Sequence, residues 1–212
     1  MGTTATVLVA LAGVAALVDW WSVARERLGV EFIAAPLVVI GLIGAALAVD
    51  TGDGVVRGLV VAALGASLVG DVVLMTPDAR FEAGVFALLV AHVLYITAFL
   101  ETGGLEFGAG VAAALLITGI GFGAVPQIIA GAQSHGAAAQ TGVTVSIAVI
   151  AATAVLAAAT GALTAMVAGA LFLASDALLG WNRFVDRAPG GRVLVHVTNH
   201  AAQVGFVLWL TG

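Results

Sequence analysis

Two aspartates stand inside hydrophobic stretches of this chain, each after a small residue and before an apolar run. Asp71 follows Gly70, and Asp176 follows Ser175. A carboxylate at the depth of a bilayer is costly, so an ionisable residue there indicates a functional site. Like charges close together in a low-dielectric cavity cannot both ionise easily, so one carboxyl group keeps its proton. The pair therefore predicts acid–base chemistry by two carboxyl groups.

A stripe of polar residues accompanies the aspartates near the end of the chain. His196, Asn199, His200 and Gln203 stand at i, i+3, i+4 and i+7, which places all four on one face of a helix. Hydrogen bonds between helices would account for such residues without a catalytic role. Four of them within two turns favour a wall of a wet cavity.

His92 and Tyr95 share a helical face at i and i+3, and either fits a core position as well as a site. Asn182 and Arg183 follow Asp176 by six and seven residues. Arg183 on the face of Asp176 also fits a structural ion pair between the two. Asp19, followed by Trp20 and Trp21, indicates a helix end at the membrane interface.

A metal centre is a separate hypothesis for these residues. Two aspartates and two or three histidines at one depth could bind zinc or iron, and His196 and His200 have the i, i+4 spacing of ligands. No glutamate stands between them in an HExxH arrangement, and the chain has no cysteine. We expect neither a metal nor another cofactor for the reaction.

The elements that must position these residues are membrane helices. Hydrophobic residues make up 62% of the 212 residues and charged residues 9%, against about 25% in soluble domains. A helix needs roughly 20 apolar residues to cross a bilayer. Eight stretches qualify: Thr4–Val23, Phe32–Val49, Val56–Met75, Ala83–Leu100, Leu105–Ile129, Thr141–Ala159, Ala162–Trp181 and Val193–Leu210.

The expected fold is therefore all-α, a polytopic integral membrane protein with a bundle of eight transmembrane helices. One integral membrane domain covers residues 1–212. Gly70-Asp71 is followed by His92 in the next segment, and Ser175-Asp176 is followed by His196 and His200 in the next. This recurrence suggests a faint internal repeat of two sets of four helices. The net charge of −5 argues against nucleic acid as a partner, and the oligomeric state stays open.

The loop arginines predict the orientation in a cell membrane. Six of the seven arginines fall in odd-to-even connections, and only Arg57 falls in an even-to-odd one. The positive-inside rule makes the arginine-rich side cytoplasmic, with both termini extracytoplasmic. Asp71, Asp176, Gln127, Asp19 and the polar stripe then lie at one depth, so we expect a cavity open toward the cytoplasm.

The chain resembles the YhhN-like family at these residues. The matching stretches are Ser67–Met75, Phe81–Gly84, Phe86–Tyr95, Gly169–Phe184 and Thr198–Gln203, and the Ser-Asp to Asn-Arg-Phe block within Gly169–Phe184 is the most specific. Characterised members of that family are lysoplasmalogenases with eight membrane helices.

The resemblance implies hydrolysis of the vinyl ether bond of a lysoplasmalogen to a fatty aldehyde and a glycerophospho-alcohol. The substrate is then a lysophospholipid among membrane lipids. Asp71 and Asp176 would be catalytic. The expected substrate-binding residues are His92, Tyr95, Asn182, Arg183, His196, Asn199, His200 and Gln203. Arg183 and Arg80 would pair with the lipid phosphate.

Two alternatives stay open at this stage. A small lipid or solute transporter would use the same polar residues at membrane depth without breaking a bond. A hydrolase of another membrane lipid, such as a metal-dependent amidase, would use them on a different bond. Incubation with a lysoplasmalogen and its saturated ether analogue separates vinyl ether hydrolysis from both.

Overall fold

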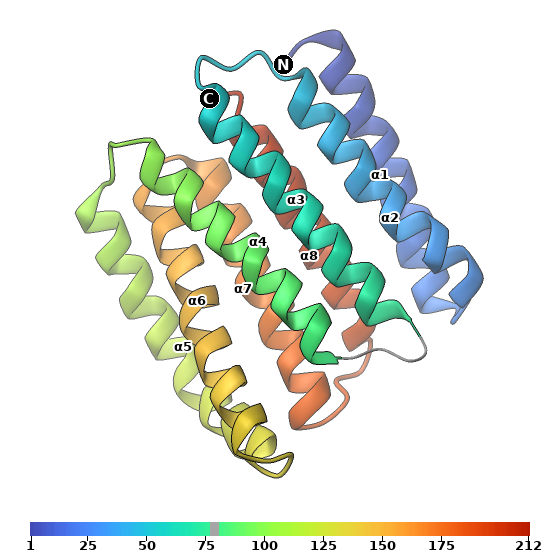
Figure 1. Ribbon diagram of the computed structural model, residues 1–212, viewed down its shortest axis with the longest axis vertical. Coiled ribbons are helices and arrows are strands. Elements are labelled where there is room, and N and C mark those ends of the chain that lie inside the picture. The colour runs from blue at the N-terminus through green and yellow to red at the C-terminus, as the bar shows by residue number, and fades with distance from the viewer. Residues whose placement is uncertain (77–80) are drawn as a thin grey trace.

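The structure is a computed structural model that describes residues 1–76 and 81–212, and within these ranges it is all-helical (Figure 1). The helices are α1 (Thr3–Ala24), α2 (Leu28–Ala48), α3 (Gly54–Met75), α4 (Phe81–Glu101), α5 (Phe107–Gln133), α6 (Ala137–Ala159), α7 (Leu163–Phe184) and α8 (Gly191–Trp209). Each of the eight expected segments is helical, and seven of the helices meet the length and hydropathy of a membrane span. The predicted starts of α2 and α6 were four residues late, because Glu31 and Gln140 in their first turns lower the apolar signal that sets a predicted boundary.

Seven of these helices are long and apolar enough to cross a membrane, and α8 is the exception within the described residues. Its 19 residues include the polar stripe and Arg192, which lower its apolar character. Large apolar side chains such as Leu115, Ile120 and Phe122 are more than 60% exposed on the outside of the bundle. Such a surface suits contact with lipid, and the chain is a multi-pass membrane protein.

The helices pack in a nearly closed circuit. Chain neighbours form the hairpins α1–α2, α3–α4, α5–α6 and α7–α8, and further contacts join α2 to α3, α4 to α6, α6 to α7 and α8 to α1. Helix α5 packs on α6 and α7 at the outer edge (Figure 1). Helix α8 touches α1, α2, α3 and α7, so its polar face lies inside protein.

Small residues let the helices approach closely beside Asp71. A Cβ atom added to Gly70 of α3 would lie 2.8 Å from the Leu88 side chain and 3.1 Å from the Gly84 carbonyl oxygen of α4. Helix association in lipid relies on such close packing, since lipid tails are as apolar as the side chains. The α3–α4 contact therefore fixes the position of Asp71.

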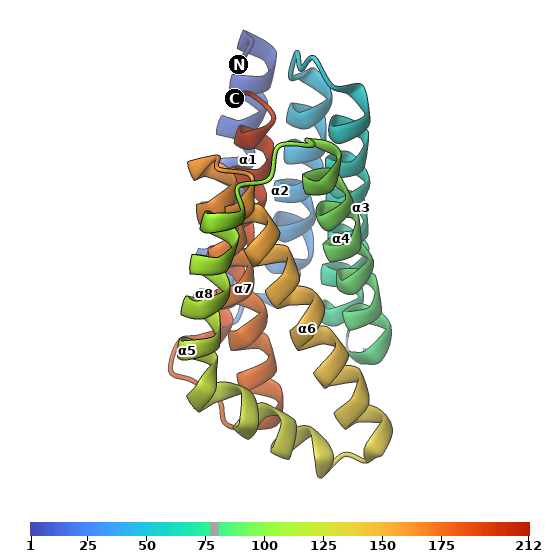
Figure 2. The ribbon, with the colours of Figure 1, turned by 90° about the vertical axis from the view of Figure 1, so that its left-hand side faces the viewer.

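Both termini lie at one end of the bundle (Figures 1 and 2). The connections that carry Arg25 and Arg27, and Arg187, lie at the other end. This agrees with the prediction that the odd-to-even connections share one end and the termini the other. Which end faces the cytoplasm stays a prediction. Arg80 lies outside the described residues.

Candidate functional site

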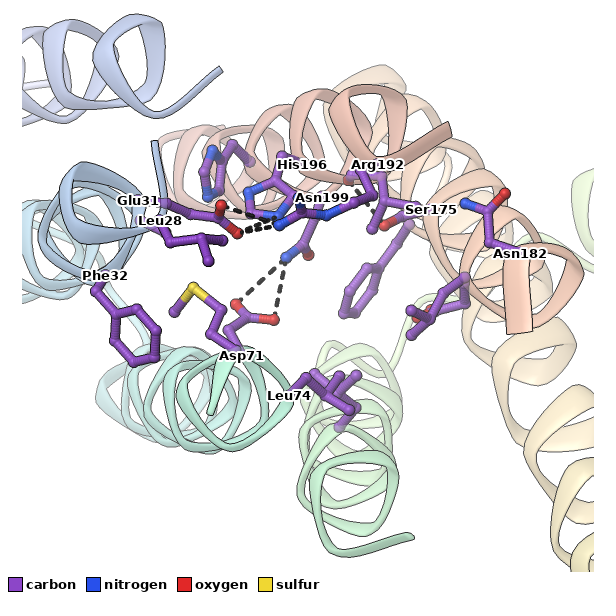
Figure 3. A pocket seen from close by; sticks show the side chains of 18 residues that line it. Leu28, Glu31, Phe32, Asp71, Leu74, Ser175, Asn182, Arg192, His196 and Asn199 are labelled. Atoms are coloured by element: carbon purple, nitrogen blue, oxygen red, sulfur yellow. Dashed lines mark hydrogen bonds and ion pairs between the residues drawn. The ribbon is translucent and has the colours of Figure 1, made fainter. Parts of the chain in front are cut away.

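A cavity of about 240 Å³ lies between α2, α3, α4, α7 and α8. Six of the residues expected for the site line it, as Figure 3 shows for several of them: Asp71, Asp176, Asn182, His196, Asn199 and His200. Leu28, Met75 and Arg192 from the helix ends also line it. The cavity is therefore at the end of the bundle that carries the arginine-bearing connections.

Asp176 is held by a chain of buried hydrogen bonds. Its Oδ2 lies 2.9 Å from Nε2 of His92, and Nδ1 of His92 lies 2.9 Å from Oγ1 of Thr153. The Thr153 hydroxyl donates to the Val149 carbonyl at 2.9 Å, so its oxygen accepts from Nδ1–H of His92. One further proton is then shared between Nε2 of His92 and Asp176. Asp176 is therefore held by a short hydrogen bond to a ring that Thr153 fixes in turn.

Asp71 has weaker partners. The amide Nδ2 of Asn199 lies 3.3 Å from its Oδ2 and 3.5 Å from its Oδ1, at the limit of hydrogen bonding (Figure 3). Gln203 donates to Asn199 at 3.4 Å and so supports the amide from behind. Asp71 thus faces the cavity and is held by one weak hydrogen-bond donor, the Asn199 amide.

A second cavity of about 210 Å³ adjoins the first between α4, α5, α6 and α7. Its wall is almost wholly apolar and includes Ile117, Ala124 and Ile147. Three residues, Leu88, Asp176 and Leu179, line both cavities. Asp176 therefore stands where a polar compartment meets an apolar one.

The sequence analysis missed one carboxylate of the polar cavity, Glu31. Glu31 lines it, is 2% exposed and accepts hydrogen bonds from Nη2 of Arg192 at 2.7 and 2.9 Å (Figure 3). Starting the second segment at Phe32 excluded Glu31. Arg192 stands four residues before His196, on the face of the polar stripe, and that spacing was a usable signal.

The expected convergence of Asp19 with the polar stripe is confirmed, whereas its interpretation as an interfacial helix end was wrong. Asp19 is fully buried, and its Oδ2 lies 2.7 Å from Nδ1 of His196. Nδ1 of His200 lies 3.9 Å from the same oxygen and accepts a hydrogen bond from Nε1 of Trp20 at 3.2 Å. These partners stand about 180 residues away along the chain, so no local pattern could reveal them.

Four other predicted residues do not line the polar cavity. Tyr95 is fully buried among Phe99, Phe172 and Phe206, and within residues 1–76 and 81–212 its hydroxyl has no hydrogen-bond partner. The remaining three are His92, which lines the apolar cavity, Gln203, which lies behind Asn199, and Arg183, whose guanidinium lies 4.8 Å from the Phe81 ring centre. The alternative of an Arg183–Asp176 pair was wrong, since Asp176 pairs with His92.

Gln127 does not join the site either. It is exposed on α5, and its side-chain amide donates to the Gly123 carbonyl at 2.8 Å. The expected convergence of Gln127 with the aspartates was wrong, because α5 packs outside the helices that enclose the polar cavity.

The family model described as the YhhN family matches residues 30–210. The chain belongs to the YhhN family. The match confirms the resemblance seen in the sequence, and it includes every residue expected for the site. Asp19 lies before the matched range. No curated protein and no solved structure matches this YhhN family chain.

Proposed function

We propose that the protein is a hydrolase that cleaves the vinyl ether bond of lysoplasmalogens in the cell membrane. Membership of the YhhN family supports this reaction class. The observation that carries the proposal is the position of the two aspartates. Asp71 of α3 and Asp176 of α7 line one cavity, and Asp176 also lines the apolar cavity beside it.

The two cavities match the two ends of the substrate. The alkenyl chain fits the apolar cavity, whose wall includes Ile120, 72% exposed on the outside of the bundle. The chain can therefore enter from the hydrocarbon core. The vinyl ether bond then lies at the junction beside Asp176, and the glycerol moiety extends into the polar cavity.

Arg192 is the arginine best placed for the lipid phosphate. Its side chain is 55% exposed, it lines the polar cavity, and only Nη2 is engaged, by Glu31. The remaining guanidinium donors are available to a phosphate oxygen. Arg192 replaces Arg183 in this role, because Arg183 packs on Phe81 away from the cavity.

The hydrogen bonds assign different roles to the two aspartates. Asp176, paired with His92, serves as the anion that stabilises a cationic intermediate. Asp71, held only by the Asn199 amide, serves as the proton donor. Its O–H bond transfers a proton to the β-carbon of the vinyl ether, and an oxocarbenium ion forms.

Water completes the reaction. Its oxygen adds to the α-carbon, and the proton that it loses returns to Asp71. The hemiacetal then collapses to the aldehyde, and the glycerol oxygen leaves with a proton. The logic parallels that of glycosidases, in which two carboxyl groups also serve an oxocarbenium-like transition state. Neither a serine nor a cysteine nucleophile is required.

The test compares a lysoplasmalogen with its saturated alkyl ether analogue, using purified protein in nanodiscs. We expect aldehyde release from the vinyl ether only, because protonation of a carbon–carbon double bond starts the reaction. Aldehyde release from neither lipid would contradict the proposal. Movement of uncleaved lysolipid across vesicles containing the protein would favour a transporter instead.

The cavity would act from the cytoplasmic side. It lies at the end with the arginine-bearing connections, and the positive-inside rule places that end in the cytoplasm. Labelling of a single cysteine introduced at Arg27 by a membrane-impermeant reagent would test this, with labelling in intact cells as the contrary result.

A further inference from the structure

Three side chains beside the polar cavity, two of them buried and His196 partly buried, form a cluster that the proposed reaction does not use. They are Asp19 of α1 with His196 and His200 of α8, and one potential ligand atom from each lies within 4.8 Å of the others. Two imidazoles and one carboxylate form a donor set typical of zinc and other divalent transition metals. The cluster is therefore a candidate metal centre by its chemistry and by its spacing.

The burial and hydrogen bonding of the Asp19 side chain are a second, independent observation in favour of a bound cation. The side chain is fully buried, yet its Oδ1 has no hydrogen-bond partner among the residues that the structure describes. A buried carboxylate oxygen without a partner is costly, and such groups need a proton, a water molecule or a cation. A metal ion bound by the Asp19 carboxylate would offset this cost.

The surroundings of His196 resemble the outer ligands of known metal centres. Its Nδ1 faces Asp19, while its Nε2 lies 3.7 Å from Oε1 of Glu31. Glu31 is in turn fixed by Arg192 at 2.7 Å. Histidines that bind metals through one ring nitrogen commonly present the other to a carboxylate, which fixes the orientation of the ring.

Charge balance around the cavity also favours a cation. Besides the proton donor Asp71, the carboxylates Asp19, Glu31 and Asp176 lie in or beside it, whereas Arg192 is the arginine that lines it among the described residues. Uncompensated negative charge inside a membrane protein is costly. A divalent ion at the cluster would offset much of this charge.

We propose that Asp19, His196 and His200 bind a divalent transition-metal ion of the zinc class. His196 and His200 both line the polar cavity, so the open coordination position faces it. A metal with three protein ligands keeps a position for water or for a substrate oxygen. The metal ion would thus be a Lewis acid that binds an oxygen atom in the polar cavity, at a site separate from Asp71 and Asp176.

The hydrogen bond from Trp20 to His200 provides a further test of the proposal. The Nε1–H of Trp20 donates to Nδ1 of His200, the nitrogen that faces Asp19. A metal bound to that nitrogen displaces this hydrogen bond, because both use the same lone pair. Removal of the indole N–H in Trp20→Phe is therefore expected to strengthen metal binding.

The experiment measures metal binding directly, not activity. Protein without a polyhistidine tag is purified, stripped with a chelator, loaded with zinc or cobalt and freed of excess ion. We expect about one ion per chain by mass spectrometry, and cobalt absorption of the intensity given by tetrahedral sites. Asp19→Asn and His200→Gln should each lose the ion, and Trp20→Phe should bind it at least as tightly as the unaltered protein.

The matched control is His135→Gln, which removes an exposed histidine at the end of α5 and should retain the ion. Size-exclusion profiles and circular dichroism establish that each variant is folded. Less than about a tenth of an ion per chain in the unaltered protein would overturn the proposal. Unchanged stoichiometry in a folded Asp19→Asn variant would overturn it equally.

Discussion

Asp71 and Asp176 stand in similar local sequences but in different surroundings. Each follows a small residue in an apolar helix, near the same end of the bundle. Asp176 is tied through His92 to Thr153 by contacts of 2.9 Å, whereas Asp71 meets only an amide at 3.3 Å. The side chain on the facing helix makes the difference: α4 supplies an imidazole to Asp176 and α8 supplies an amide to Asp71.

The difference shows how one residue type can serve two chemical roles. A carboxylate with a charged hydrogen-bond donor is a stable anion, and a carboxyl group with a weak donor is free to exchange its proton. The compartments differ in the same way. Of the two cavities, Asp71 lines only the polar one. Asp176 lines both, including the apolar cavity that would hold the alkyl chain.

The largest effect is expected from removing either carboxyl group. Asp71→Asn and Asp176→Asn keep the shape but can neither donate the proton nor become an anion, so kcat should fall about 10²–10⁴-fold. Aldehyde release from a lysoplasmalogen is the measurement. Asp50→Asn, an exposed change at the opposite end of the bundle, is the control. Near-normal activity of either site variant would refute the two-aspartate mechanism.

The partners of the two aspartates should differ in importance. His92→Gln removes a charged donor worth about 1.5–3 kcal/mol, so kcat should fall about 10–100-fold. Asn199→Ala removes a longer, neutral contact and should cost less than about 5-fold. Steady-state kinetics of both variants decide the order. A larger loss for Asn199→Ala would reverse the assignment of roles.

Arg192→Gln tests the polar cavity. Loss of a charged contact to phosphate should raise KM about 10-fold with kcat nearly unchanged. Because Glu31 then loses its partner, the double variant Glu31→Gln/Arg192→Gln is the matched control, and Arg25→Gln is the surface control. If the double variant restores KM, the single change acted through the stranded Glu31 and not through the phosphate.

The smallest effect concerns the apolar cavity. Ala124→Phe adds a ring to its wall and should slow cleavage of long-chain lysoplasmalogens a few-fold, while short-chain analogues are cleaved normally. Ala112→Phe, on the exposed face of the same helix, is the control. Equal slowing of both chain lengths would show that the chain does not occupy this cavity.

The sequence by itself predicted the helices, their number and the residues of highest chemical interest. Hydrophobic length defines membrane helices because the bilayer demands it, and the spacing of the α8 polar residues placed them on one face. The residues for which prediction failed are those whose partners are distant in sequence. Nothing near Asp19 indicates His196, and nothing near Asp176 indicates that its donor is His92 and not Arg183.

Tertiary structure alone decided which helices face one another. The contact between α1 and α8 turned an expected interfacial residue into part of a buried cluster. The packing of α4 on α6 placed Thr153 behind His92, and the outer position of α5 removed Gln127 from the site. In lipid every helix is apolar along most of its length, so periodicity marks the faces weakly and only close packing selects the partners.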